Sequence, residues 1–176
     1  MKSIKKWIIS LAIVVGVLIM ASSLSSYAYL NQKFGWQSTS IPIRNATSSA
    51  YTTVVKNSIA AWNKAIPGRI NIYQSSSAQN TIYSGNYADS WIGYYSYYTR
   101  NGKTYKFNIY LNNRLLASKS SNYKQSTLVH ELGHALSLAD NPPTSPSIMR
   151  YDRNRNTLIT PQKDDINGVK NFYKIK

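Results

Sequence analysis

Apolar residues recur along the chain at two different spacings, and each spacing predicts one type of element. In residues 47–68 the spacing is helical and Pro67 and Gly68 end the pattern, so we predict a helix there. Its apolar stripe consists of Ala50, Val54, Ile59, Ala61, Trp62 and Ile66. Short strands are predicted at residues 40–45, at residues 69–73, where Ile70 and Ile72 share one face, and at residues 80–85.

Residues 91–113 have the pattern of a β-hairpin. Two β-rich runs flank Asn101 and Gly102, a dipeptide that accepts the positive φ angles of a tight hairpin turn. On the return strand apolar residues alternate with polar ones and are expected to face the core: Tyr105, Phe107, Ile109 and Leu111. The outgoing strand carries aromatic residues on both faces, which indicates either packing or an exposed surface for a glycan or a peptide.

Two more helices are predicted towards the C-terminus. Residues 121–138 form the first, with Asn122 as N-cap and Gln125 in the capping-box position. Its buried stripe is Leu128, Leu132, Ala135 and Leu136. The prolines of residues 141–147 force a loop, and the last helix is predicted at residues 161–173 with Thr160 as N-cap. Strand, helix, several strands, helix, loop and helix make an α+β domain with one sheet.

Residues 1–28 have the pattern of a secretory signal peptide. Lys2, Lys5 and Lys6 precede an uncharged apolar run at residues 7–21, and Ser26 and Ala28 occupy the positions that a signal peptidase requires. The run is short for a membrane span, which takes about 20 residues, so retention as an N-terminal membrane anchor is the alternative. In either case residues 29–176 are expected to be one domain outside the cytoplasm.

The charge of the chain narrows the choice of partners. It has 21 Lys and Arg against 6 Asp and Glu, a net charge of +15, of which the signal peptide's lysines contribute 3. In an exported protein this charge favours anionic cell-surface polymers over nucleic acid, although a solvated basic surface explains it equally well. The chain has no cysteine, so packing, and a metal if one binds, must stabilise the fold.

The segment "HELGH" contains both histidines and the single glutamate of the 176 residues. On a helix, His130 and His134 project from the same side and can bind one Zn²⁺. Glu131, one residue further round the helix, is placed to act as a general base on a water molecule. Coincidence is improbable when the chain places all three residues within five positions of a predicted helix.

A catalytic zinc site usually has three protein ligands, and here the third must be an aspartate because no further histidine or glutamate exists. The candidates are Asp140, Asp152, Asp164 and Asp165. The last two fit the first turn of the final helix, and Asp152 fits a surface position among arginines. Asp140 lies six residues after His134, where a chain that leaves the helix near Ser137 can turn back to the metal. We therefore predict Asp140 as the third ligand.

The segment "HELGHALSLAD" resembles the extended motif HExxHxxGxx of the metzincin metallopeptidases, which is followed by His or Asp as third ligand. With an aspartate it is similar to the snapalysin-like secreted bacterial proteases. "SPSIMRY" supplies Met149 where that family has a methionine turn beneath the zinc. "ITPQKDDINGVKNFY" and "WQSTSIPIRN" resemble the C-terminal helix and the start of matrixin-type catalytic domains. Ser137 stands where the family has glycine, and a positive φ at a non-glycine residue costs about 1 kcal/mol.

The resemblance implies a metzincin-like zincin fold: a mixed five-stranded sheet, an active-site helix, the methionine turn and a C-terminal helix. It implies that residues 29–176 are a metallopeptidase catalytic domain in which zinc polarises the scissile carbonyl, while Glu131 takes a proton from water and passes it to the leaving amine. An edge strand binds substrate by strand addition, for which the return strand with Tyr105, Phe107 and Ile109 is our candidate. Arg150 and Tyr151 are expected to shape the specificity pocket.

The leading hypothesis is thus a secreted, monomeric zinc endopeptidase with one catalytic Zn²⁺ that acts on proteins or peptides. A calcium site is left open, because the few acids do not indicate one. The alternative is a cationic protein that binds cell surfaces on a protease scaffold with weak or lost catalysis. Glu131 argues against this alternative, since a pure binding protein needs no general base. An enzyme that cleaves peptidoglycan also fits the charge, but no residue points to it.

Overall fold

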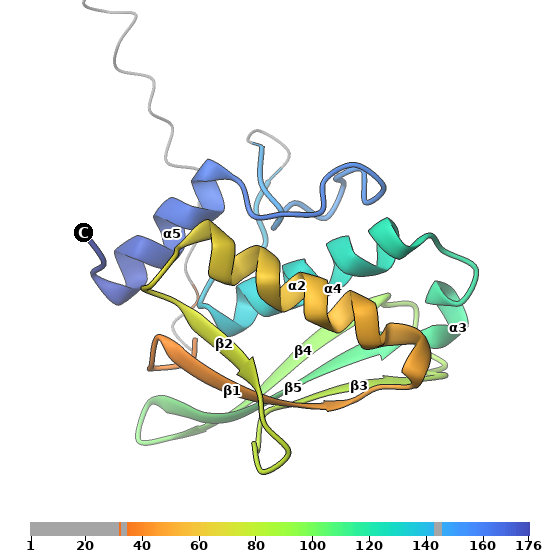
Figure 1. Cartoon of the computed structure of the whole chain (residues 1–176), viewed down its shortest axis with the longest axis horizontal. Coiled ribbons are helices and arrows are strands. Elements are labelled where there is room, and N and C mark those ends of the chain that lie inside the picture. Colours follow the sequence, from red (N-terminus) through yellow and green to blue (C-terminus); the bar gives the residue numbers. More distant parts are fainter. Residues whose placement is uncertain (1–31, 33–34, 143–145) are drawn as a thin grey trace, which may run out of the picture.

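The structure is a computed structural model that describes residues 32, 35–142 and 146–176 (Figure 1). The predicted signal peptide and its apolar run lie outside the described residues. Within the described part of the chain, no helix is both long and apolar enough to cross a membrane.

A five-stranded mixed sheet forms one layer of the α+β fold (Figure 1). The strands are β1 (Ser40–Ala46), β2 (Asn71–Gln74), β3 (Thr81–Gly85), β4 (Gly93–Arg100) and β5 (Lys103–Asn112). Their order is β2-β1-β3-β5-β4, and every neighbouring pair is parallel except β4 and β5, which are antiparallel. The predicted hairpin is confirmed, and Asn101 and Gly102 both have the positive φ that its turn requires.

Helices cover one face of the sheet (Figure 1). They are η1 (Ser49–Tyr51), α2 (Thr52–Ala65), α3 (Asn113–Leu116), α4 (Ser121–Ala135) and α5 (Lys163–Tyr173). Helix α2 packs beside α4, and the fully buried Trp62 of α2 donates a hydrogen bond from Nε1 to the Val129 carbonyl of α4 at 2.9 Å. This contact fixes α4 against the core. In the stripe predicted for α2, Ala50 is exposed and Val55 is buried instead, because the helix proper begins only at Thr52.

The N-caps of two helices differ from those predicted. The N-cap of α4 is Ser120, whose side chain accepts a hydrogen bond from the Tyr123 backbone N–H, so the prediction of Asn122 was wrong by two positions. The N-cap of α5 is Gln162 rather than Thr160. Asp165 at the third helical position completes its capping box by accepting the Gln162 backbone N–H.

The predicted role of β5 as the edge strand was wrong. Because β5 lies between β3 and β4, the edge on this side of the sheet is β4. Phe107 and Ile109 are completely buried under the helices and cannot contact a substrate. Tyr105 is 41 % exposed rather than buried, because a bulge leaves it as an extra residue between the pairs Tyr98–Lys106 and Thr99–Thr104.

Candidate metal centre

Helix α4 carries both histidines on one side. His130 and His134 are one helical turn apart, and their ring centroids lie 4.8 Å from each other. Both side chains are nearly buried, each residue being 8 % exposed. The spacing of four residues on a helix therefore brings the two imidazoles close together, as the sequence predicted.

Asp140 meets the two imidazoles. Its Oδ1 lies 3.1 Å from Nε2 of His130 and 3.7 Å from Nε2 of His134. One ligand atom of each of these three residues lies within 4.8 Å of the other two. Among the described residues, this is the only group of three or more His, Cys, Asp or Glu side chains whose ligand atoms lie so close together. Ligand atoms at about 2.1 Å from a tetrahedral zinc are separated by about 3.4 Å, so these spacings suit zinc.

The hydrogen bonds of the two rings show which nitrogen is free to bind a metal. Nδ1 of His130 lies 2.9 Å from the Ile148 carbonyl, and Nδ1 of His134 lies 2.8 Å from the Leu138 carbonyl. A carbonyl only accepts, so each Nδ1 carries the proton and each Nε2 presents a lone pair to Asp140. Three acceptors that converge without a proton between them can bind a cation, and the set of ligand atoms fits Zn²⁺.

Burial keeps both rings neutral. It lowers the pKa of His130 to about 4 and also lowers the pKa of His134. The pKa of Asp140 is lowered from its ordinary value, with the short contact to His130 as the first cause, so the carboxylate is ionised at neutral pH. All three groups are thus in the protonation state that metal binding needs.

The end of α4 turns the chain back towards the histidines. Ser137 has a φ of +74°, its N–H bonds to the His134 carbonyl, and the Leu138 N–H bonds to the Gly133 carbonyl. This is a Schellman motif with serine at the position that usually belongs to glycine. The turn places the Leu138 carbonyl on His134 and brings Asp140 to the metal position two residues later.

The segment that precedes β1 supports this turn. The Gln32 N–H donates to the Ser137 carbonyl at 2.7 Å, and Ser137 Oγ donates to the Gln32 carbonyl at 2.6 Å. Gly35 packs against Ser137 so closely that a Cβ at Gly35 would overlap both its side chain and its backbone. These contacts offset the strain of a positive φ at serine.

Met149 lies in a tight turn beneath α4. The Arg150 N–H bonds to the Ser147 carbonyl across the turn, and the Met149 side chain packs on Gly133, where a Cβ would collide with its sulfur. The buried Asp165 holds the turn from below: it accepts hydrogen bonds from Ser147 Oγ and from the Ile148 N–H. Since Ile148 is also the partner of His130, α5 helps to orient a metal ligand.

Glu131 lies beside the three-ligand group in a buried position. Burial raises the pKa of its carboxyl to about 8, although the nearby Arg153 opposes the shift. The carboxylate packs against the backbone of Gly93 on β4, where a Cβ would overlap Oε1. Glycine at this position is therefore needed to let the edge strand approach Glu131.

Arg153 follows the exposed Asp152 in the sequence, but it is only 6 % exposed. Its guanidinium donates to the hydroxyl and the carbonyl of Ser126 on α4 and to the Arg150 carbonyl. It therefore ties the segment after Met149 to α4 and contributes a positive charge near Glu131 and Asp140. No sequence signal distinguishes this arginine from its exposed neighbours, and the same is true of Gly35 and Gly93.

The remaining candidates lie away from the three-ligand group. Asp152 forms an ion pair with Arg150 at 2.9 Å, and Asp164 accepts a hydrogen bond from Asn141. Neither belongs to the group with the histidines. Tyr151 is 61 % exposed, so its ring is accessible to a substrate. That Tyr151 and the neighbouring Arg150 shape a specificity pocket stays a prediction.

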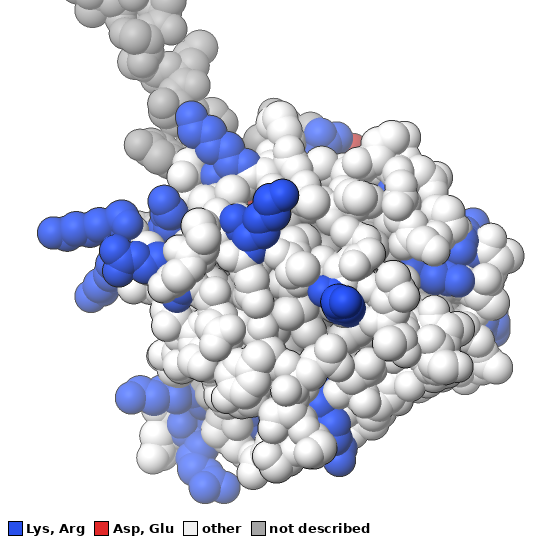
Figure 2. Space-filling model, viewed as in Figure 1, with Lys and Arg blue, Asp and Glu red and all other residues white. Residues whose placement is uncertain are grey.

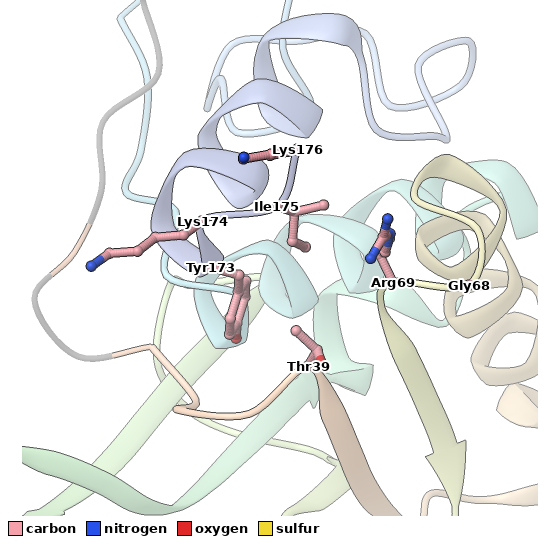
Figure 3. A pocket seen from close by; sticks show the side chains of 7 residues that line it. All are labelled: Thr39, Gly68, Arg69, Tyr173, Lys174, Ile175 and Lys176. Carbon is pink, nitrogen blue, oxygen red and sulfur yellow. The ribbon is translucent and has the colours of Figure 1, made fainter.

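A hollow of about 500 Å³ lies at the C-terminal end of the chain and is separate from the metal centre (Figure 3). It is lined by Thr39, Gly68, Arg69, Tyr173, Lys174, Ile175 and Lys176. Figure 3 shows the Lys174 side chain pointing away from Arg69, so these cations do not converge on one point.

No protein-family model and no curated protein matches the sequence. Among solved structures, the fold is similar to a chain in the "GM1 bound form of the ECX AB5 holotoxin", with a TM-score of 0.55 and 17 % identity over 83 % of this chain and 84 % of that chain. A second similar structure is high choriolytic enzyme 1, a hatching-enzyme zinc-protease from Oryzias latipes (medaka fish). It has a TM-score of 0.47 and 15 % identity over 81 % of this chain and 95 % of that chain. At such identities the likeness concerns the fold, a mixed α+β architecture with a five-stranded sheet.

We expect Gly35→Ala to damage the metal centre although Gly35 lies outside it. The added Cβ would push the N-terminal segment off Ser137, lowering the free energy of unfolding by about 1–3 kcal/mol and weakening zinc binding. Adding Ser137→Gly should restore only part of both losses, because the Cβ also meets the Ser137 backbone. Chemical denaturation and competition with a zinc chelator measure the two quantities, with Ser38→Ala as control. Unchanged zinc affinity in Gly35→Ala would contradict this role.

The raised pKa of Glu131 predicts a pH dependence of stability in the metal-free protein. Between about pH 4.5 and pH 8 the unfolded chain has released the Glu131 proton while the folded chain still holds it. Stability therefore falls as pH rises through this window, by about 1.4 kcal/mol per pH unit from this one group. In Glu131→Gln this loss is absent, so its stability advantage over the wild type should grow from pH 5 to pH 8. Urea titrations in the presence of a chelator test this, and a constant difference would refute it.

Proposed function

We propose that this chain is a zinc-dependent endopeptidase. The observation that carries the proposal is the convergence of Nε2 of His130, Nε2 of His134 and the Asp140 carboxylate beside the buried carboxyl of Glu131. Structural zinc sites usually have four protein ligands, whereas catalytic ones have three and leave room for water or substrate. Three ligands with an adjacent carboxylate fit the catalytic class.

The bound metal would supply Lewis acidity, which polarises the scissile carbonyl and makes water a stronger acid. The chain supplies the proton transfers. Glu131 accepts a proton from the attacking water and delivers it to the nitrogen of the leaving amine.

The open edge of β4 is the substrate-binding strand in this proposal, in place of β5. Among the described residues, strand β4 pairs only with β5, so an extended peptide can add as a further strand along the other side of its first half, residues 93–96. Gly93 at the start of β4 touches Glu131, so a peptide bound along this edge passes the general base. Tyr95 and Tyr97 point to the same face, and Tyr95 packs 5.9 Å from the His134 ring. Arg150 and Tyr151 would contribute from the opposite side.

We further propose that the enzyme is secreted and works as a monomer on protein or peptide substrates. The signal-peptide pattern of residues 1–28 and the excess of Lys and Arg support an extracellular location.

The first test is cleavage of casein by the purified protein. The wild type should cleave it, and removal of zinc by a chelator should abolish cleavage. Glu131→Gln should lose activity by about 10²–10⁴-fold while it still binds zinc, because only the proton transfer is removed. Asp140→Ala should lose zinc affinity, whereas Asp152→Ala, which removes an equal charge from the surface, should not.

Two results would count against the proposal. Cleavage that persists without metal would exclude a zinc mechanism. Zinc binding without cleavage of any peptide would favour the cell-surface-binding alternative.

A second prediction concerns the edge strand. Gly93→Ala should lower kcat by about 10²-fold, because the Cβ displaces the Glu131 carboxylate and small displacements of a catalytic group are costly. Zinc affinity should change little, since the ligands are on α4 and the following turn. Ser96→Ala on the same strand is the matched control. Equal activity of Gly93→Ala and the control would show that Glu131 does not depend on β4.

A further inference from the structure

We propose that the solvent face of the sheet is a docking surface for an anionic glycan polymer. We call this surface the outer face. It is the side opposite the helices and it carries alternate residues of the strands: Pro42, Arg44, Tyr73, Tyr83, Tyr94, Tyr98, Lys106 and Tyr110. No helix of the described chain lies on it (Figure 1). The proposal is independent of the peptidase function.

Tyrosines form a row across three strands of the outer face. Tyr83, Tyr110 and Tyr94 are direct neighbours in the register. The ring centroids of Tyr83 and Tyr110 are 5.4 Å apart and those of Tyr110 and Tyr94 are 6.2 Å apart, in both cases with stacked rings. The rings of this row therefore cover faces of one another, while Tyr94 at its end stays 49 % exposed.

The loop 86–92 extends this row and is held rigidly. Tyr87 packs edge-on against Tyr110, and Trp91 packs against Tyr94. The buried Asn112 accepts a hydrogen bond from the Tyr87 N–H and donates to two loop carbonyls, and the Arg114 guanidinium donates to three. The aromatic array is therefore arranged before any ligand binds, which lowers the entropic cost of binding.

The charge of the sheet has one sign. None of the five strands contains an Asp or Glu, and their cations are Arg44, Arg100, Lys103 and Lys106. Nζ of Lys106 lies 5.2 Å from the centroid of the Tyr98 ring, and the Arg100 guanidinium lies 5.0 Å from that of Tyr105. Figure 2 shows Lys and Arg side chains over the β4–β5 hairpin at the lower left, without an acidic residue beside them. An anionic partner is complementary to this surface.

The form of the outer face favours a glycan over other anionic polymers. The backbone groups of β3 and β5 are used within the sheet, so a peptide cannot add to this face as a strand. Single-stranded nucleic acid binds by stacking its bases on exposed ring faces, but here the faces stack on one another. Ring edges and phenolic hydroxyls suit a polymer rich in hydroxyl groups, and the cations suit its acidic groups. The metal centre is on the other side of the sheet and stays accessible.

The test measures binding of the purified protein to heparin, a sulfated glycan, and to hyaluronan, a carboxylated one, at about 150 mM salt. Neutral dextran and single-stranded DNA are the comparison polymers. One triple variant removes cations of the sheet (Arg44→Gln, Lys103→Gln, Lys106→Gln). A matched control removes three exposed cations of the helical layer (Lys56→Gln, Lys64→Gln, Lys119→Gln), so both variants have the same net charge. A double variant, Tyr83→Phe with Tyr94→Phe, keeps the rings and removes two hydroxyls.

We expect the sheet variant to bind both anionic glycans about tenfold more weakly and the control to stay within about twofold of the wild type. The Phe variant should weaken binding severalfold without a change in net charge. Thermal unfolding confirms that each variant is folded. Equal weakening by the two triple variants would overturn the proposal, because net charge alone would then explain binding. Binding to heparin no tighter than to dextran, or tighter binding to DNA, would overturn it as well.

Discussion

The metal centre depends on the reversal of the chain at Ser137. Helical spacing alone brings His130 and His134 together, but two imidazoles do not make a catalytic site. The positive φ of Ser137 ends α4, directs the Leu138 carbonyl to Nδ1 of His134 and returns the chain so that Asp140 faces both Nε2 atoms. One backbone conformation thus sets the position of Asp140 and the tautomer of His134.

A serine in this conformation is tolerated because the strain is offset elsewhere. Ser137 Oγ and the Ser137 carbonyl both bond to the backbone of Gln32, and Gly35 leaves room for the serine side chain. The small residue that this turn needs is therefore Gly35, in the segment before β1, rather than a glycine at position 137 itself. In the same way α5 supports the site from a distance, because Asp165 fixes the turn that carries Ile148 and Met149.

The parts of the fold that follow from local spacing were predicted correctly from the sequence. These include the α+β arrangement, the hairpin at Asn101 and Gly102, and the helix that carries both histidines. The errors concern features that depend on distant contacts. The edge position of β4 follows from the order of the strands, which no local pattern encodes. Tyr105 is exposed because of a bulge. Arg153, for which no prediction followed from the sequence, is buried because Ser126 of α4 and the Arg150 carbonyl offer it acceptors.

We propose that His130, His134 and Asp140 hold one catalytic zinc ion. A crystal structure of the zinc-loaded protein, with anomalous diffraction data on both sides of the zinc absorption edge, would locate this ion. We expect one strong peak within about 2.1 Å of both Nε2 atoms and of an Asp140 oxygen. A peak bound by other residues, or no peak at this position in a zinc-saturated crystal, would contradict it.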